Sequence, residues 1–143
     1  MSLAHGWATG PTSALTNYVA GIGPEFSSAV PFHVIPHPGD LTQASATVSL
    51  SSGTVSTSWK YSQNGNSFLE TITAPQSVEG RYGIPTGGNP ITLSIDGQRV
   101  WSCQGKEEVL SGMNFGDVFL EGNYVYLSSV AGSHKVIADA CPS

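Results

Sequence analysis

The segment GTVSTSWKYSQNGNSFLETITAP, residues 53–75, decides the fold. In its first half, larger side chains alternate with small or charged ones, at Val55, Thr57, Trp59 and Tyr61. This alternation is typical of a strand with one buried face. Asn64-Gly65 then favours a two-residue turn, because both residues tolerate the positive φ that a tight hairpin needs. A second strand, residues 67–74, ends before Pro75, so the segment predicts a β-hairpin.

The alternation leaves two registers open for this hairpin. A two-residue turn at Asn64-Gly65 collects five side chains on one face: Trp59, Tyr61, Phe68, Glu70 and Ile72. A three-residue loop, residues 64–66, would instead set Lys60 opposite Glu70 and Leu69 opposite Tyr61. We favour the two-residue turn, because burying two more large apolar side chains, at about 1.5–3 kcal/mol each, should outweigh an exposed ion pair at about 0–1 kcal/mol.

Length and composition indicate one all-β domain. The 143 residues include 17 glycines and 9 prolines, and 10% of the residues are charged, which is typical of a chain with many turns. Asp96-Gly97 is a second two-residue hairpin signal. Short strands are expected at residues 32–35, 46–50, 78–84, 91–95, 99–101, 117–120, 124–127 and 135–138. About ten short strands are typical of a sandwich or a barrel, and we expect an antiparallel, jelly-roll-like β-sandwich.

One helix is expected before the strands. Leu15, Val19 and Ile22 fall at i, i+4 and i+7 and form one apolar stripe. Pro11 suits the first turn of a helix, and glycines at the other end favour termination near residue 21. A helix of about ten residues is not stable in water without a surface to lie on.

The distribution of charge excludes two classes of partner. The net charge is −5, and the five cations are scattered along the chain without a basic cluster. This argues against nucleic acid and against anionic membrane surfaces. No apolar run approaches the length of a membrane span. The first residues, MSLAHGW, lack the basic start and apolar core of a signal peptide.

The two cysteines, Cys103 and Cys141, are too few for a structural zinc site. They could form one disulfide that closes a long loop, or they could be two separate buried thiols. A disulfide and a low content of charged residues fit an extracellular protein better than a cytosolic one.

Three segments carry a resemblance to a known family. They are HGW-x-x-GPT at residues 5–12, V-x-PHPGDL at residues 34–41, and the small-residue end at residues 131–133. In this order they are similar to the C-terminal end of the α-L-rhamnosidases, and the resemblance extends from Ser2 to about Ala138. These are inverting glycosidases in which a large helical catalytic barrel is followed by a C-terminal β-sandwich.

The resemblance divides the chain in two. It implies that residues 1–23 are a remnant of the last helix of the barrel and that residues 24–143 are the C-terminal sandwich. The short helix would then pack on a missing barrel or fold back on the sandwich. The catalytic carboxylates of the family lie upstream, so no catalytic residue is expected here. His5 matches a sugar-contacting histidine of the family, and Trp7 could wall the same pocket.

Other candidate chemistry is weaker. Glu107 and Glu108 are adjacent in a polar loop, and residues in an extended chain point apart, so they do not form an acid and base pair. His33, His37 and Asp40 lack a fourth metal ligand. We therefore expect no metal and no cofactor.

Two functions from different classes remain. The first is an accessory sandwich that supports the barrel of a secreted, rhamnosidase-like glycoside hydrolase and is inactive alone. The second is a free-standing carbohydrate-binding module that stacks Trp59 and Trp101 on sugar rings, including those of rhamnose-containing glycans. Both tryptophans lie in alternating strands, where a place in the core is the more common outcome. Their solvent exposure, with that of Tyr124 and Tyr126, separates the two functions.

Overall fold

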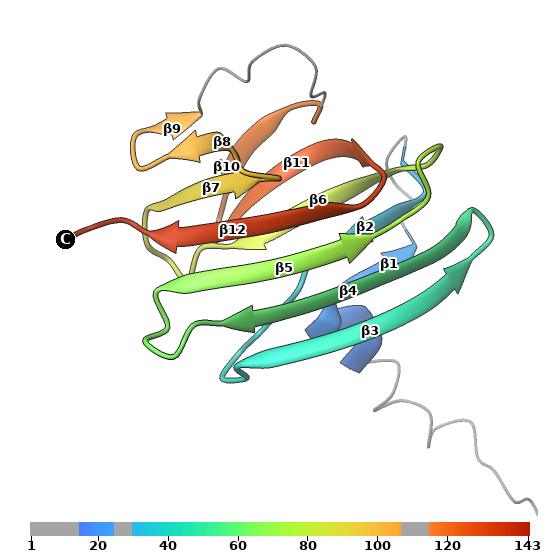
Figure 1. Cartoon of the computed structure of the whole chain (residues 1–143), viewed down its shortest axis with the longest axis horizontal. Helices are drawn as coiled ribbons and strands as arrows, with labels where there is room; N and C mark the ends of the chain where they lie inside the picture. Colours follow the sequence, from blue (N-terminus) through green and yellow to red (C-terminus); the bar gives the residue numbers. More distant parts are fainter. Residues whose placement is uncertain (1–14, 25–29, 107–114) are drawn as a thin grey trace, which may run out of the picture.

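The computed structural model describes residues 15–24, 30–106 and 115–143, and these residues form two packed β-sheets (Figure 1). The five-stranded sheet has the order β1 (Ile22–Pro24), β2 (Phe32–Val34), β6 (Glu79–Pro85), β11 (Tyr124–Ala131), β10 (Val118–Glu121). The seven-stranded sheet has the order β3 (Gln43–Leu50), β4 (Gly53–Tyr61), β5 (Ser67–Thr73), β12 (His134–Ala140), β7 (Ile91–Ile95), β8 (Gln98–Ser102), β9 (Gly105–Lys106). The expected all-β sandwich is confirmed.

The register of the β4–β5 hairpin is the favoured one. Tyr61 pairs with Phe68, and Trp59 pairs with Glu70. The turn itself differs from the prediction, because the N–H of Gly65 bonds to the carbonyl of Ser62. Gln63 and Asn64 are therefore the central residues, and Gly65 follows them with a φ of 73°. Asp96-Gly97 does form the two-residue turn between β7 and β8, with φ values of 51° and 82°.

The core lies between the two sheets and is made of the inward side chains of alternating strands. Its largest fully buried members come from both sheets: Trp59, Ile72, Leu93 and Ile95 from one, and Phe32, Tyr82, Ile84 and Leu127 from the other. Burying these side chains contributes about 1.5–3 kcal/mol for each aliphatic one. Thr57 and Glu70, at 2% and 1% exposure, are buried polar side chains within this apolar layer.

Phe32 and Gly80 lie in close contact inside the five-stranded sheet. β2 runs parallel to β6, with Phe32 directly opposite Gly80. A Cβ atom on Gly80 would lie 2.4 Å from two ring atoms of Phe32. The absence of a side chain at position 80 therefore makes room for the phenyl ring.

The N-terminal helix is described only in its last part, and it ends at the glycines as predicted. The described part is one π-helical piece, η2 (Leu15–Ala20), and the expected apolar stripe is not a single helical face. Ile22 is fully buried but lies in β1, whereas Leu15 is 57% exposed. The chain leaves the helix at Gly21, whose φ of 89° suits glycine. Residues 11–14, where the helix was expected to begin, lie outside the described residues.

The piece η2 lies on the sandwich and contacts β3 and β4. The indole N–H of Trp59 donates a 3.2 Å hydrogen bond to the carbonyl of Val19. The backbone N–H of His37 bonds to the carbonyl of Tyr18. The predicted domain boundary between residues 23 and 24 falls inside β1, so the division into a barrel remnant and a sandwich remains a prediction about a longer protein.

Candidate functional site

A pocket of about 370 Å³ lies where the two sheets separate, and we call it the Trp101 pocket. Three segments that are distant in sequence form it: the loop between β6 and β7, the β8–β9 turn, and the β10–β11 turn. Its side chains include Asn89, Trp101, Ser102, Gln104, Leu120 and Asn123. Figure 1 shows β8 and β9 beside β10 and β11 at this end of the molecule. None of the described residues that line the pocket is charged.

A strand irregularity places Trp101 at the pocket. Leu93 pairs with Trp101 and Ser94 pairs with Arg99, so one extra residue, Val100, is accommodated in β8. A bulge of this kind turns neighbouring side chains relative to the sheet. Val100 is fully buried, and Trp101 packs against the edge of the core while it lines the pocket.

Hydrogen bonds hold the β6–β7 loop and the β10–β11 turn, which form the other two walls of the pocket. The N–H of Thr86 donates to the carbonyl of Asn123, which joins the β6–β7 loop to the β10–β11 turn. The hydroxyl of Thr86 accepts a hydrogen bond from the N–H of Gly88. Gly122 opens the β10–β11 turn with a φ of 59°, a conformation in which glycine is not strained.

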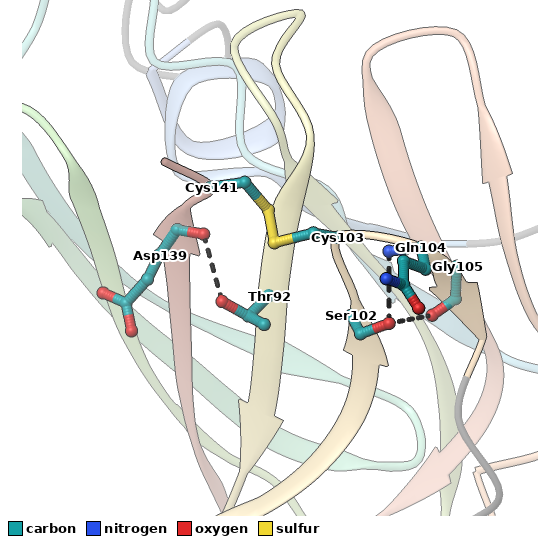
Figure 2. The surroundings of a disulfide bond; sticks show 7 residues. All are labelled: Thr92, Ser102, Cys103, Gln104, Gly105, Asp139 and Cys141. Atoms are coloured by element: carbon teal, nitrogen blue, oxygen red, sulfur yellow. Dashed lines mark hydrogen bonds between the residues drawn. A yellow bond between two sulfur atoms is a disulfide. The ribbon is translucent and has the colours of Figure 1, made fainter. Parts of the chain in front are cut away.

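The disulfide Cys103–Cys141 holds the third wall against the C-terminal segment (Figure 2), and the Cα atoms are 5.9 Å apart. The structure thus contains the bridge rather than two separate thiols. Ser102 organises the turn next to it, since its hydroxyl donates to the carbonyl of Gly105 and accepts from the N–H of Gln104 (Figure 2). The N–H of Cys141 bonds to the carbonyl of Pro90, at the opposite wall.

Of the predicted site residues, the structure describes Trp59, Trp101, Cys103 and Cys141. His5, Trp7, Glu107 and Glu108 lie outside the described residues. Trp59 is 1% exposed, so its proposed stacking on sugar is wrong for this conformation: both faces of the ring are covered by the core. Trp101 is partly exposed in the pocket and remains a stacking candidate.

A row of aromatic rings on the outside of the five-stranded sheet was missed at the sequence level. Tyr18 stacks on His37 with ring centroids 3.9 Å apart. The row continues through Tyr124 and Tyr126 to Phe119, with neighbouring centroids 5.5–5.8 Å apart. The outward positions of Tyr124 and Tyr126 could have been read from their alternation with buried Val125 and Leu127. The rings at the two ends of the row, Tyr18 and Phe119, remain 59% and 36% exposed.

The described carboxyl groups do not form an acid and base pair. Burial raises the pKa of Glu70 to about 8, and the hydrogen bond from Thr57 only partly opposes this. Glu70 lies in the core and does not line the Trp101 pocket. Asp96 is bound to His134 at 2.6 Å and to the N–H of Lys135. Within residues 15–24, 30–106 and 115–143, no group of three His, Cys, Asp or Glu side chains could hold a metal ion.

Solved structures with a similar fold include two α-L-rhamnosidases. An α-L-rhamnosidase from Dictyoglumus thermophilum matches with a TM-score of 0.65 and 20% identity over 87% of this chain. A Streptomyces avermitilis α-L-rhamnosidase complexed with L-rhamnose matches with a TM-score of 0.59 and 21% identity over 91% of this chain. The fold is that of one segment of an α-L-rhamnosidase. No family model and no curated protein matches the sequence.

The α-L-rhamnosidases are much longer than this chain. The match covers 13% of the Dictyoglumus thermophilum chain and 11% of the Streptomyces avermitilis chain. The resemblance read from the sequence motifs is thereby supported at the level of the fold.

None of the helices in the described ranges is both long and apolar enough to cross a membrane.

Proposed function

We propose that this chain is the C-terminal accessory β-sandwich of a rhamnosidase-like glycoside hydrolase and that it supports the catalytic barrel of that enzyme. One observation carries the proposal: the fold matches nearly all of this chain but only 11–13% of each rhamnosidase. A segment of that size is a domain added to a larger catalytic body.

The chemistry of the described residues supports a role without catalysis. Glycoside hydrolysis by inversion needs two opposed carboxyl groups about 6.5–9.5 Å apart with room for water. Glu70 has the raised pKa of a general acid, but it is 1% exposed and cannot reach a substrate. The acid and base of the parent enzyme would therefore lie in its barrel. His5 and Trp7 would reach the sugar there, from the segment that joins the two domains.

Two surface features suit a contact with the preceding domain. Leu15 and Tyr18 on η2 are 57% and 59% exposed, which is high for large apolar and aromatic side chains on one short helix. They lie where the chain would come from the barrel, and Tyr18 begins the aromatic row. We propose that the barrel of the same protein covers this end of the row. The disulfide fits a secreted parent enzyme.

Two measurements test the proposal. The purified 143-residue chain should not release the aryl group from an aryl α-L-rhamnoside. Turnover that disappears in one carboxylate variant of this chain would overturn the proposal. The transcript should also encode, upstream of Met1, a helical region with the acid and base. An upstream stop codon in frame, with no such region, would contradict the accessory role.

A further inference from the structure

We propose that the Trp101 pocket binds a neutral sugar, either a monosaccharide or the terminal residue of a glycan. The proposal is independent of the accessory role, because it concerns a different part of the surface from η2 and the aromatic row. It depends on the size of the pocket, the absence of charge among its described lining residues, and the arrangement of one aromatic ring with unpaired amide groups.

The size of the pocket suits a small ligand. Its volume of about 370 Å³ is at the lower end of the range of about 300–1,000 Å³ for ligand sites. It lies between the ends of two sheets and is open on one side, so the end of a longer glycan could enter. Trp101 packs against the core, so the pocket ends there and a ligand would enter only from the open side.

The lining selects against charged ligands. No described residue that lines the pocket carries a charge, and the chain as a whole has a net charge of −5. Among these lining residues an anion would find no cation to pair with, and the net charge would repel it at long range. A cation would lose water without gaining a carboxylate. A polar but uncharged molecule is therefore the chemical class that the pocket fits.

The polar groups match hydroxyl groups. A sugar hydroxyl both donates and accepts, and the side-chain amides of Gln104 and Asn123 can do the same. Within the described part of the chain, neither amide has a hydrogen-bond partner, and the same is true of the Trp101 side chain. These groups are free to bind a ligand without breaking a bond of the fold.

The apolar groups match the other side of a sugar ring. A pyranose presents C–H groups on one face, and an aromatic ring is a suitable surface for them. Trp101 supplies that surface from β8, and Leu120, which is 54% exposed, extends it from β10. An exposed leucine beside a tryptophan in a pocket would be covered when the ligand binds.

The walls are already held in place. The disulfide Cys103–Cys141 restrains the β8–β9 turn, and the hydrogen bond from Thr86 to Asn123 joins the other two segments to each other. A pocket that is ordered before binding loses less conformational entropy when the ligand arrives. This matters for a small sugar, since it makes few contacts.

NMR titration of the tryptophan indole signals tests the site. The protein is titrated with L-rhamnose, D-galactose, D-glucose and D-mannose to roughly 50 mM, which reaches Kd values in the millimolar range. At least one of these sugars should shift the Trp101 signal in a saturable way. The Trp59 signal should stay in place, because its N–H is bonded to Val19 inside the fold. D-glucuronate should have no effect.

Variants assign the binding to the pocket. Trp101→Ala should abolish the saturable shifts of nearby backbone signals. Gln104→Ala and Asn123→Ala should each weaken binding by about three- to tenfold, the equivalent of one lost hydrogen bond. Both side chains are exposed and make no bond within the described fold, so these variants should still fold. Gln63→Ala removes an exposed glutamine of the β4–β5 turn that is not among the residues lining the pocket, and it should change nothing.

Four results would overturn the proposal. The first is the absence of any saturable shift at Trp101 with all four sugars. The second is a shift of equal size at Trp59 and Trp101, which would indicate a general solvent effect. The third is binding that survives Gln104→Ala and Asn123→Ala unchanged. The fourth is equally strong binding of D-glucuronate.

Discussion

The hydroxyl group of Thr57 donates a 2.6 Å hydrogen bond to the carboxyl group of Glu70, and neither side chain reaches water. The second carboxyl oxygen of Glu70 has no hydrogen-bond partner among the described residues. An ionised carboxylate with one hydrogen bond in an apolar layer is costly. Glu70 is therefore held in its protonated form at neutral pH, which agrees with its pKa of about 8.

Glu70→Gln should stabilise the protein at high pH. The folded pKa of Glu70 is about 8, above its ordinary value of 4.5, so the folded state binds one more proton than the unfolded state between these values. The free energy of unfolding should fall as the pH rises from about 4.5 to about 8. Glutamine does not titrate, so the variant should lose this slope and exceed the parent protein at pH 8 by on the order of a few kcal/mol.

Urea unfolding at pH 4, 6 and 8 measures this difference. Glu79→Gln is the matched control, because Glu79 is an exposed residue at the start of β6. It should leave the pH dependence as it is. Equal stability of the parent protein and Glu70→Gln at pH 8 would contradict a costly buried carboxyl group at this position.

Asp96→Asn should weaken the protein at neutral pH but not in acid. Burial raises the pKa of Asp96, but the N–H of Lys135 and the ring of His134 lower it more, so the pKa lies below its ordinary value of 3.8. The stability from this carboxylate is present above that value and is lost as the pH falls through the folded pKa. Because the pair is partly exposed, the loss at pH 7 should be about 0–1 kcal/mol.

Asparagine keeps the backbone of this turn, since it tolerates the φ of 51° at position 96. The difference in unfolding free energy between Asp96→Asn and the parent protein is measured by thermal unfolding from pH 7 to pH 3. It should shrink below pH 3.8. Asp40→Asn, in an exposed loop, serves as the control and should be neutral throughout. A difference that persists unchanged in acid would exclude an electrostatic origin.

Breaking the disulfide should lower the stability without changing the fold. The bridge joins residues that are 38 positions apart, and a loop of this order stabilises a protein by about 2–4 kcal/mol. Cys103→Ser with Cys141→Ser should unfold at a correspondingly lower urea concentration, and its circular dichroism spectrum should still be that of a β protein. The parent protein treated with a reducing agent should match the double variant, whereas the double variant itself should not respond to the reducing agent.

Gly80→Ala should destabilise the five-stranded sheet through a steric conflict. The new methyl group would lie 2.4 Å from the Phe32 ring, and overpacking of this kind costs about 1–3 kcal/mol. Phe32→Leu in the same chain should recover part of the loss, because the smaller side chain leaves room for the methyl group. A double-mutant cycle on urea midpoints measures the coupling. Purely additive effects would show that the two positions do not conflict.

The sequence predicts the strands well because most of them have one buried face. Alternation located β4, β5 and β7, and the burial argument selected the register that also places Glu70 in the core. The same local rules failed at Ile22. Its spacing from Val19 fits a helix, but Gly21 ends the helix and Ile22 finds a partner strand in β2. The secondary structure at Ile22 is determined by its pairing with Val34 in β2, and the periodicity of the local sequence does not report such pairing.

The Trp101 pocket could be foreseen only in part. Trp101 was recognised as a stacking candidate, but its access to solvent depends on the irregular pairing of β7 with β8. Gln104 and Asn123 lie in turns that gave no signal of their own. Their proximity follows from the order of strands in both sheets, which includes a parallel pair, β2–β6, that local patterns do not reveal.

The position of β12 has a consequence for the order in which the sheet can form. β12 lies in the middle of the seven-stranded sheet, between β5 and β7, although both of these strands precede it in the sequence (Figure 1). Until β12 inserts, β5 and β7 each present an unpaired edge. Substitutions that weaken the pairing of β12 should therefore leave two open edges, and such edges invite aggregation.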